Sequence, residues 1–173
     1  IVGDAAKQRY KLLGTDIEDV KKELLEVNNL ALEGKPEDMV ITSHICRGNY
    51  HSTFFTSGPY DSVADYVFAK ENVDALFLEY DGARSGGFAP LAKVSPDKKV
   101  VLGLITTKTP QLEEKEVVIK RIHEAAKYIP LDRLYLSPQC GFASCEIGNK
   151  LTEEEQWAKL KLVKEIAEEV WGE

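Results

Sequence analysis

The sequence predicts an α/β fold built from four parallel βα units. Three observations support this fold class. Short apolar runs rich in β-branched residues alternate with longer segments that have helical periodicity. These runs show no polar alternation, which is typical of parallel strands buried on both faces. They recur roughly every 25–35 residues, which is the usual size of a βα unit.

The first half of the chain is expected to contain two helices and two strands. Thr15 and Glu18 form a capping box that predicts the start of a helix over 16–32, and Gly34 followed by Pro36 predicts its end. Apolar runs predict the strands, and a segment rich in Gly, Asn, Ser and Thr predicts a loop. The expected bounds after the first helix are a strand at 39–43, a loop at 47–59, a helix at 60–71 and a strand at 75–79.

The second half is expected to contain two further strands and two long helices. Thr109-Pro110 precedes one of these helices, and Thr152 with Glu155 forms a second capping box before the other. Crossover connections that carry a helix imply parallel strands with right-handed connections. The expected bounds are a Gly-rich loop at 81–87, a short helix at 88–94, a strand at 100–105, a helix at 113–128, a strand at 134–136 and a helix at 152–171.

Two architectures have this order of elements: an open doubly wound sheet and part of a (β/α)₈ barrel. No Gly-rich phosphate-binding fingerprint follows any of the predicted strands, which argues against a nucleotide-binding open sheet. Four units make half of a barrel, the chain begins at Ile1, and Met39 is its only methionine. We therefore expect residues 1–173 to form one domain, the C-terminal half of a (β/α)₈ TIM barrel whose N-terminal half lies outside this chain.

Composition and charge narrow the class of partner. The chain has 173 residues and a formal net charge of −7, which argues against nucleic acid or an anionic membrane surface as the main partner. Its apolar runs are shorter than the roughly 20 residues needed to span a membrane. Three cysteines form no disulfide framework, so a reducing cytoplasm is the expected location.

Four potential metal ligands lie at the ends of the predicted strands. His44 and Cys46 end the first strand and point the same way, because side chains two apart in a strand share a face. Glu79 ends the second strand, and Cys140 lies just past the fourth. The carboxyl ends of parallel strands meet at one edge of the sheet, where α/β folds bind their ligands. One imidazole, two thiolates and one carboxylate at this edge predict a tetrahedral zinc site.

These residues also have ordinary structural interpretations. A single cysteine is often a small buried apolar residue, and a glutamate after a strand is often a cap or a salt-bridge partner. Cys145 could compete as a ligand, His51 could line the site, and His123 lies within a helical pattern that favours a surface position. No serine has the histidine and aspartate partners of a hydrolase triad in its pattern.

The motifs His44-Ile45-Cys46, Glu79 and Pro138-Gln139-Cys140-Gly141 resemble those of the cobalamin-independent methionine synthase family, in its C-terminal catalytic domain. The resemblance covers nearly the whole chain and is greatest to the short single-barrel proteins of the family. It implies methionine biosynthesis by methyl transfer from 5-methyltetrahydrofolate, or a related methyl donor, to the zinc-bound thiolate of homocysteine. It also implies one Zn²⁺ ion with four ligands, His44, Cys46, Glu79 and Cys140.

The chain departs from the family pattern at two places. Gln139 stands where the family has Asp before its zinc-binding Cys, and the stretch 104–110 lacks the family's histidine that helps to protonate the leaving folate. Lys108 or Thr106 is the expected substitute and thus the candidate catalytic residue. The substrate contacts of the family lie mostly on earlier strands, so none is predicted here.

Two alternatives to methionine synthesis stay open. The same motifs resemble those of the epoxyalkane–coenzyme M transferases, in which a zinc-activated thiol attacks a different electrophile. The chain could also be a non-catalytic fragment with a vestigial metal site.

Overall fold

The computed structural model describes residues 4–172 and contains one sheet of four parallel strands. The strands lie side by side in the order of the chain: β1 (Thr42–Ile45), β2 (Ala75–Glu79), β3 (Lys99–Ile105) and β4 (Leu134–Pro138). This sequential order is that of a (β/α)₈ barrel, whereas a doubly wound sheet reverses its strand order at one point. The predicted fold class, four parallel βα units of a partial barrel, is therefore confirmed.

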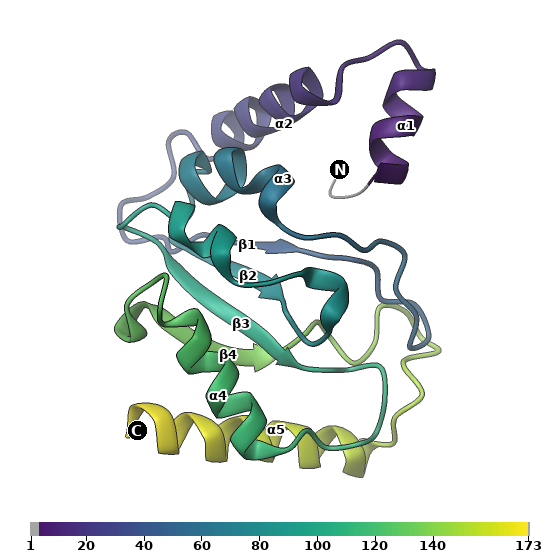
Figure 1. Ribbon diagram of the computed structural model, residues 1–173, viewed down its shortest axis with the longest axis vertical. Coiled ribbons are helices and arrows are strands. Elements are labelled where there is room, and N and C mark those ends of the chain that lie inside the picture. Colours follow the sequence, from purple (N-terminus) through teal and green to yellow (C-terminus); the bar gives the residue numbers. More distant parts are fainter. Residues whose placement is uncertain (1–3, 173) are drawn as a thin grey trace.

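Helical segments precede, connect and follow the strands. In Figure 1, α1 and α2 lie together at one end of the molecule, and α5 runs along the opposite end beside β4. The α-helices are α1 (Asp4–Leu12), α2 (Ile17–Ala31), α3 (Asp61–Val63), which continues as the π-helix η1 (Ala64–Phe68), α4 (Lys115–Ala125) and α5 (Glu153–Trp171). The 3₁₀ turns are η2 (Ala83–Ser85), η3 (Ala89–Lys93) and η4 (Leu131–Arg133). Within residues 4–172, no helix has both the length and the apolar character of a membrane span.

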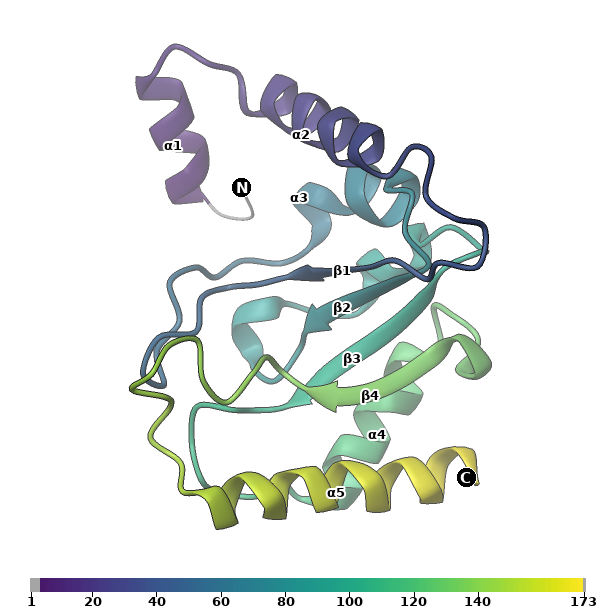
Figure 2. The same ribbon diagram turned by 180° about the vertical axis from the view of Figure 1, so that it is seen from behind.

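The two faces of the sheet differ in what covers them. On one face, Leu76 and Leu102 are completely buried and share a single core with Ile122 of α4. Figure 2 shows the molecule from the other side, where the strands lie in front of α3 and α4. On this second face, which we call the open face, Phe77 is half-buried and Tyr135 is 41 % exposed. The open face corresponds to the interior side of a barrel.

The prediction for the first strand is wrong at both ends. It was expected at 39–43, but β1 covers Thr42–Ile45. Met39 and Val40 are 45 % and 73 % exposed, so this apolar pair has no neighbouring strand to cover it. The N–H of Ile41 donates to the carboxylate of Asp74 at 2.7 Å, so the partner of this N–H is a side chain and not the backbone of a neighbouring strand. The expectation that all strands are buried on both faces also fails, because β1 alternates between exposed and half-buried residues.

The predicted start of α5 is confirmed, whereas the predicted cap of α2 and the predicted length of α4 are wrong. The cap of α2 is Asp16, whose carboxylate accepts the N–H of Glu18, so the expected capping box with Thr15 is wrong. The capping box of Thr152 and Glu155 at the start of α5 is confirmed. The expected helix over 113–128 is shorter, at Lys115–Ala125, and α1 was not predicted.

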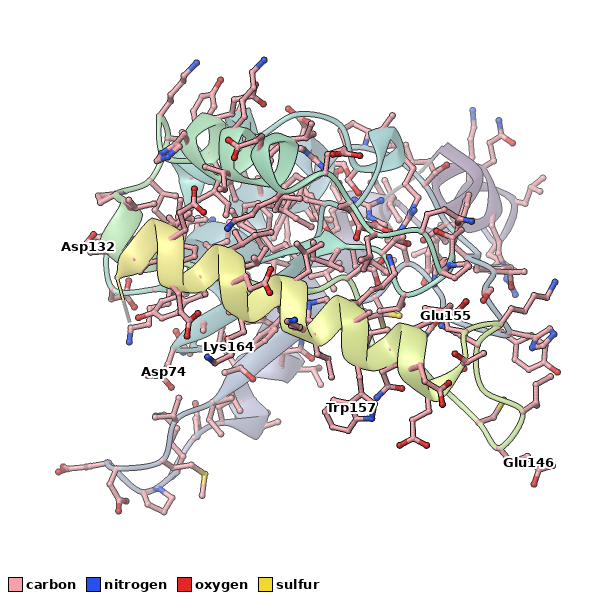
Figure 3. The ribbon with its side chains drawn as sticks, turned by 90° about the horizontal axis from the view of Figure 1, so that it is seen from below. Asp74, Asp132, Glu146, Glu155, Trp157 and Lys164 are labelled. Atoms are coloured by element: carbon pink, nitrogen blue, oxygen red, sulfur yellow. The ribbon has the colours of Figure 1, made fainter. Side chains whose placement is uncertain are left out.

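α5 supports the loop that follows β3. Lys159 of α5 is fully buried, and its Nζ donates to the C=O of Gln111 at 2.7 Å and to both carboxylate oxygens of Glu113 at 3.1 and 3.2 Å. Glu113 Oε1 also accepts the N–H of Thr106 at 2.8 Å. The hydrogen bonds of Lys159 and Glu113 fix the segment 106–114 at the carboxyl edge of the sheet. Figure 3 shows α5 from below, with Trp157 projecting outward from it.

Candidate metal centre

β1 and β2 direct three of the four predicted ligands to the open face. His44 is paired in register with Phe77, so the two side chains point to the same side. Cys46 follows His44 by two residues, and Glu79 follows Phe77 by two residues. Because side chains alternate in extended segments, all three ligands reach the same side at the carboxyl edge.

Cys140 joins these side chains from the segment after β4. The donor atoms of His44, Cys46, Glu79 and Cys140 all lie within 4.8 Å of one another. His44 Nε2 lies 3.4 Å from Glu79 Oε1 and 3.6 Å from Cys140 Sγ. Zinc bonds of roughly 2.0–2.3 Å place the donors of a tetrahedral site about 3.3–3.8 Å apart, so this arrangement fits a zinc ion. Among the described residues, no other group of three or more His, Cys, Asp or Glu side chains converges in this way.

Glu79 is held in the cluster by contacts on both its backbone and its side chain. It is completely buried, and its Oε1 accepts the N–H of Arg47 at 3.0 Å. The hydroxyl of Tyr60 accepts the N–H of Glu79 at 2.9 Å and donates to its C=O at 3.2 Å. Oε2 makes no hydrogen bond within the described residues, although Arg84 lies 3.6 Å away. A buried carboxylate oxygen without a hydrogen bond is unfavourable unless a cation such as Arg84 or a metal ion lies near it, so the position of Oε2 is compatible with a metal ligand.

The charges of the cluster favour a cation at its centre. Hydrogen bonds to Cys140 and Glu79 raise the pKa of His44 to about 10. The His44 hydrogen bond lowers the pKa of Cys140, and burial opposes this. Burial raises the pKa of Glu79, but its hydrogen bond with His44 and others outweigh this effect, so the pKa is lowered overall. The donors therefore attract a proton to His44 when no metal ion occupies their centre, and zinc would have to replace that proton.

Cys140 reaches the cluster because the chain after β4 passes very close to β3. The register between these strands shifts near Gly103, and the N–H of Gln139 donates to the C=O of Ile105 at 2.7 Å. A Cβ atom at Gly103 would lie 2.9 Å from the Cα of Gln139 and 3.0 Å from the C=O oxygen of Leu78. Both are backbone atoms that cannot turn aside, so glycine is required for this close approach.

Gly103→Ala is therefore expected to displace the Gln139–Cys140 segment. We expect weaker zinc binding and a loss of about 1–3 kcal/mol in the free energy of unfolding, as is usual for overpacking. Competition with a chromophoric chelator and urea unfolding measure the two effects. Gly87→Ala is the matched control, since nothing lies within 4 Å of a Cβ at Gly87. Unchanged zinc affinity in Gly103→Ala would show that Cys140 is not positioned by this contact.

A polar network joins the three loops that follow β1, β3 and β4. Asn49 Nδ2 donates to the C=O of Gly141 at 2.7 Å. Asn49 Oδ1 accepts from Lys108 Nζ at 3.0 Å and from Asn149 Nδ2 at 2.9 Å. Asn149 Nδ2 also donates to the C=O of Thr107 at 2.7 Å. The network therefore links Lys108 to the residue that follows Cys140.

The two predicted catalytic residues have different surroundings. Lys108 is 8 % exposed, and burial lowers its pKa although the charges of Glu79 and Cys140 oppose this. Thr106 is half-buried, and its Oγ1 accepts the N–H of Lys108 at 3.3 Å. Thr106 thus shapes the turn, whereas Lys108 places a charged group in the network beside the cluster.

An open hollow of about 250 Å³ adjoins the cluster on the open face. His44 and Cys140 belong both to the cluster and to the wall of the hollow, which is completed by Phe77, Ser137, Pro138, Gln139 and Gly141. One side of the donor set therefore faces a space that could hold a small thiol.

The weaker candidates do not join the cluster. Cys145 is exposed in the loop after β4, and His123 is exposed near the end of α4. His51 is half-buried with its Nδ1 3.2 Å from the C=O of Gly148, so it helps to tie two loops together. Sequence reasoning missed Asn49 and Asn149, whose only signal was their presence in polar loops after strands.

Comparison with known proteins identifies the family. Residues 20–169 match the family described as "Cobalamin-independent synthase, Catalytic domain". The chain belongs to this family, and the resemblance seen in the sequence is confirmed. Two relatives from Bacillus subtilis (strain 168), the uncharacterized proteins YxjG and YxjH, are 50 % identical over 165 residues and 51 % identical over 169 residues. The alignments cover 95 % and 97 % of this chain but 44 % and 45 % of the relatives, so this family member spans about half of their length.

Solved structures of the family support the fold. A Listeria monocytogenes protein, described as a candidate vitamin-B12 independent methionine synthase, aligns with a TM-score of 0.71 at 42 % identity. The alignment covers 92 % of this chain and 44 % of that chain. A B12-independent methionine synthase from Shewanella sp. W3-18-1 aligns with a TM-score of 0.70 at 24 % identity, over 88 % of this chain and 44 % of that chain, which supports the fold alone.

Proposed function

We propose that the protein transfers a methyl group from 5-methyltetrahydrofolate, or a related donor, to the sulfur of homocysteine, using a zinc ion held by His44, Cys46, Glu79 and Cys140. The supporting observation is that this donor set, in a chain of this family, converges beside an open hollow. Catalytic zinc sites stay accessible to a substrate, whereas structural ones are closed. The free cysteines fit a reducing cytoplasm as the place of action.

The chain spans about half the length of its curated relatives, so we propose that it forms the C-terminal half of a complete barrel. The other half would supply most contacts to the amino acid and to the methyl donor. Activity is therefore expected of the complete protein.

The chemistry divides between the metal and the chain. A bound zinc ion would supply a position at which a thiol loses its proton near neutral pH. Glu79 is fixed for ligation by Tyr60 and the N–H of Arg47, and Cys46 Sγ is oriented by the N–H of Gly48 at 3.3 Å. Such supporting hydrogen bonds orient metal ligands and tune them.

Methyl transfer forms an S–CH₃ bond on homocysteine and breaks the N5–CH₃ bond of the folate. The electron pair of the broken bond stays on N5, which must take up a proton. We assign the donation of this proton to Lys108, because its buried ammonium group lies in the network beside the cluster and burial lowers its pKa. Lys108 would thus act where the family has a histidine.

A second candidate function is transfer of an activated thiol to a different electrophile, as in the epoxyalkane–coenzyme M transferases. The observation that favours it is the segment 104–110, which carries Lys108 but no histidine. Opening an epoxide leaves an alkoxide, which also needs a proton, so Lys108 would fit either reaction.

The proposal is tested with the purified complete protein. Zinc content is measured first, and homocysteine or coenzyme M is then supplied with 5-methyltetrahydrofolate, methylcobalamin, S-methylmethionine or epoxypropane. We expect stoichiometric zinc and formation of methionine. A thioether from epoxypropane without methionine would favour the second candidate, and the absence of zinc and of every product would reject both.

A further inference from the structure

The side chain of Arg47 is a buried cation without a standard hydrogen bond to any residue that the structure describes. Arg47 comes directly after the predicted ligand Cys46 in the sequence and is only 1 % exposed. Within the described residues its Nε and both terminal nitrogens make no hydrogen bond of standard geometry and no ion pair, although its charge opposes the rise that burial causes in the pKa of Tyr60. A buried, unpaired charge is unfavourable for folding, so a compensating negative charge or a functional reason is expected.

The backbone of Arg47 contacts the cluster, and its guanidinium packs on the ring of Tyr60. Its N–H donates to Glu79 Oε1 at 3.0 Å, and its C=O accepts the N–H groups of Phe55 and Thr56 at 2.8 and 2.9 Å. The guanidinium lies 4.3 Å from the ring centroid of Tyr60, a distance typical of a cation–π contact. Since the hydroxyl of Tyr60 binds the backbone of Glu79, one aromatic ring connects the charge of Arg47 to a predicted ligand.

Arg84, the other arginine near Glu79, differs from Arg47 in having a partner. Its guanidinium lies 2.6 Å from Asp81 and 3.6 Å from Glu79. The charge of Arg84 is therefore largely balanced by Asp81. Arg47 has no carboxylate partner among the described residues, and its backbone N–H is bonded to Glu79, one member of a donor set with two thiols and a carboxylate.

We propose that Arg47 is a positioning residue of the metal centre, whose buried charge offsets the excess negative charge of the ligand set and of an incoming substrate thiolate. This rests on the proposed zinc function. Two thiolates and one carboxylate exceed the charge of Zn²⁺ by one, and a substrate thiolate adds another negative charge. In a poorly solvated site, a fixed cation nearby favours both zinc binding and thiolate binding.

If Arg47 acts through its charge, replacing it with methionine should weaken zinc binding without lowering the stability of the metal-free protein. Removing a buried, unpaired charge is often neutral or stabilising, so metal-free Arg47→Met is expected to unfold at the same temperature as the wild type or higher. Its zinc affinity, measured with a chromophoric chelator, is expected to fall by on the order of tenfold or more. In the cobalt-substituted protein, the charge-transfer band that reports homocysteine binding should require a higher thiol concentration. Arg47→Lys, which keeps the charge, should restore most of both affinities.

Arg133→Met is the matched control. Arg133 donates to the C=O groups of Ser95 and Lys98 at 2.6–2.8 Å, at the amino end of β4, so its loss should lower the unfolding temperature and leave zinc affinity unchanged. Wild-type zinc and thiol affinities in Arg47→Met would overturn the inference. Failure of both Arg47→Met and Arg47→Gln to fold would also overturn it and assign Arg47 a packing role. A wild-type protein that binds no zinc would instead refute the proposed function.

Discussion

Replacing Cys46 with serine is expected to release the metal ion and to abolish methyl transfer in the complete protein. A hydroxyl group is a poor substitute for a thiolate at zinc. Cys46 Sγ accepts a hydrogen bond from the N–H of Gly48, and the residue after Cys46, Arg47, binds Glu79 through its own N–H. Loss of a residue that only supports a ligand lowers metal affinity by roughly 10–100-fold, so loss of the ligand itself should exceed this range.

Cys145→Ser provides the control for this prediction. Cys145 is exposed in the loop after β4 and is not among the converging donors. Metal content by mass spectrometry and methionine formation should both match the wild type. An essential Cys145 together with a dispensable Cys46 would mean that the ligand set is wrongly chosen.

Lys108→Met is expected to lower folate-dependent turnover by about 10²–10⁴-fold, the usual contribution of a general acid. The leaving N5 atom of the folate needs a proton, and Lys108 is the buried cation linked by Asn49 to the loop of Cys140. Zinc content should be unchanged, because Lys108 is not one of the donors. Steady-state kinetics with homocysteine and 5-methyltetrahydrofolate measure the effect.

Methyl iodide separates this role of Lys108 from a structural one. Iodide leaves without needing a proton, so methylation of homocysteine by methyl iodide should be nearly the same in Lys108→Met and in the wild type. An equal loss of rate with both methyl donors would show that Lys108 holds the site together and does not donate the proton. Thr106→Ala, which removes the hydroxyl that accepts the N–H of Lys108, should have a smaller effect on both reactions.

The convergence of the four donors could be predicted because it follows from short-range rules. Alternation along an extended segment places His44 and Cys46 on one side, and parallel order brings the carboxyl ends of the strands to one edge. The exact start of β1 could not be predicted, because Met39 and Val40 have the apolar character of strand residues and yet are exposed. Whether an apolar pair is covered depends on neighbouring strands, which the local sequence does not describe.

The polar surroundings of the site were not predictable in the same way. Asn49, Lys108 and Asn149 are far apart in the chain, and only the packing of three loops brings them together. Likewise, arginine is usually a surface residue, and Arg47 is buried because the following loop folds back and donates the N–H groups of Phe55 and Thr56 to its C=O. Such contacts are set by tertiary structure, so a single sequence without its fold carries little signal for them.

X-ray absorption at the zinc edge, combined with metal analysis of the purified protein, tests the central claim most directly. The geometry of His44, Cys46, Glu79 and Cys140 predicts one zinc ion per chain with two sulfur neighbours at about 2.3 Å and two nitrogen or oxygen neighbours at about 2.0–2.2 Å. Failure to bind zinc even after reconstitution, or a zinc ion without sulfur neighbours, would contradict it.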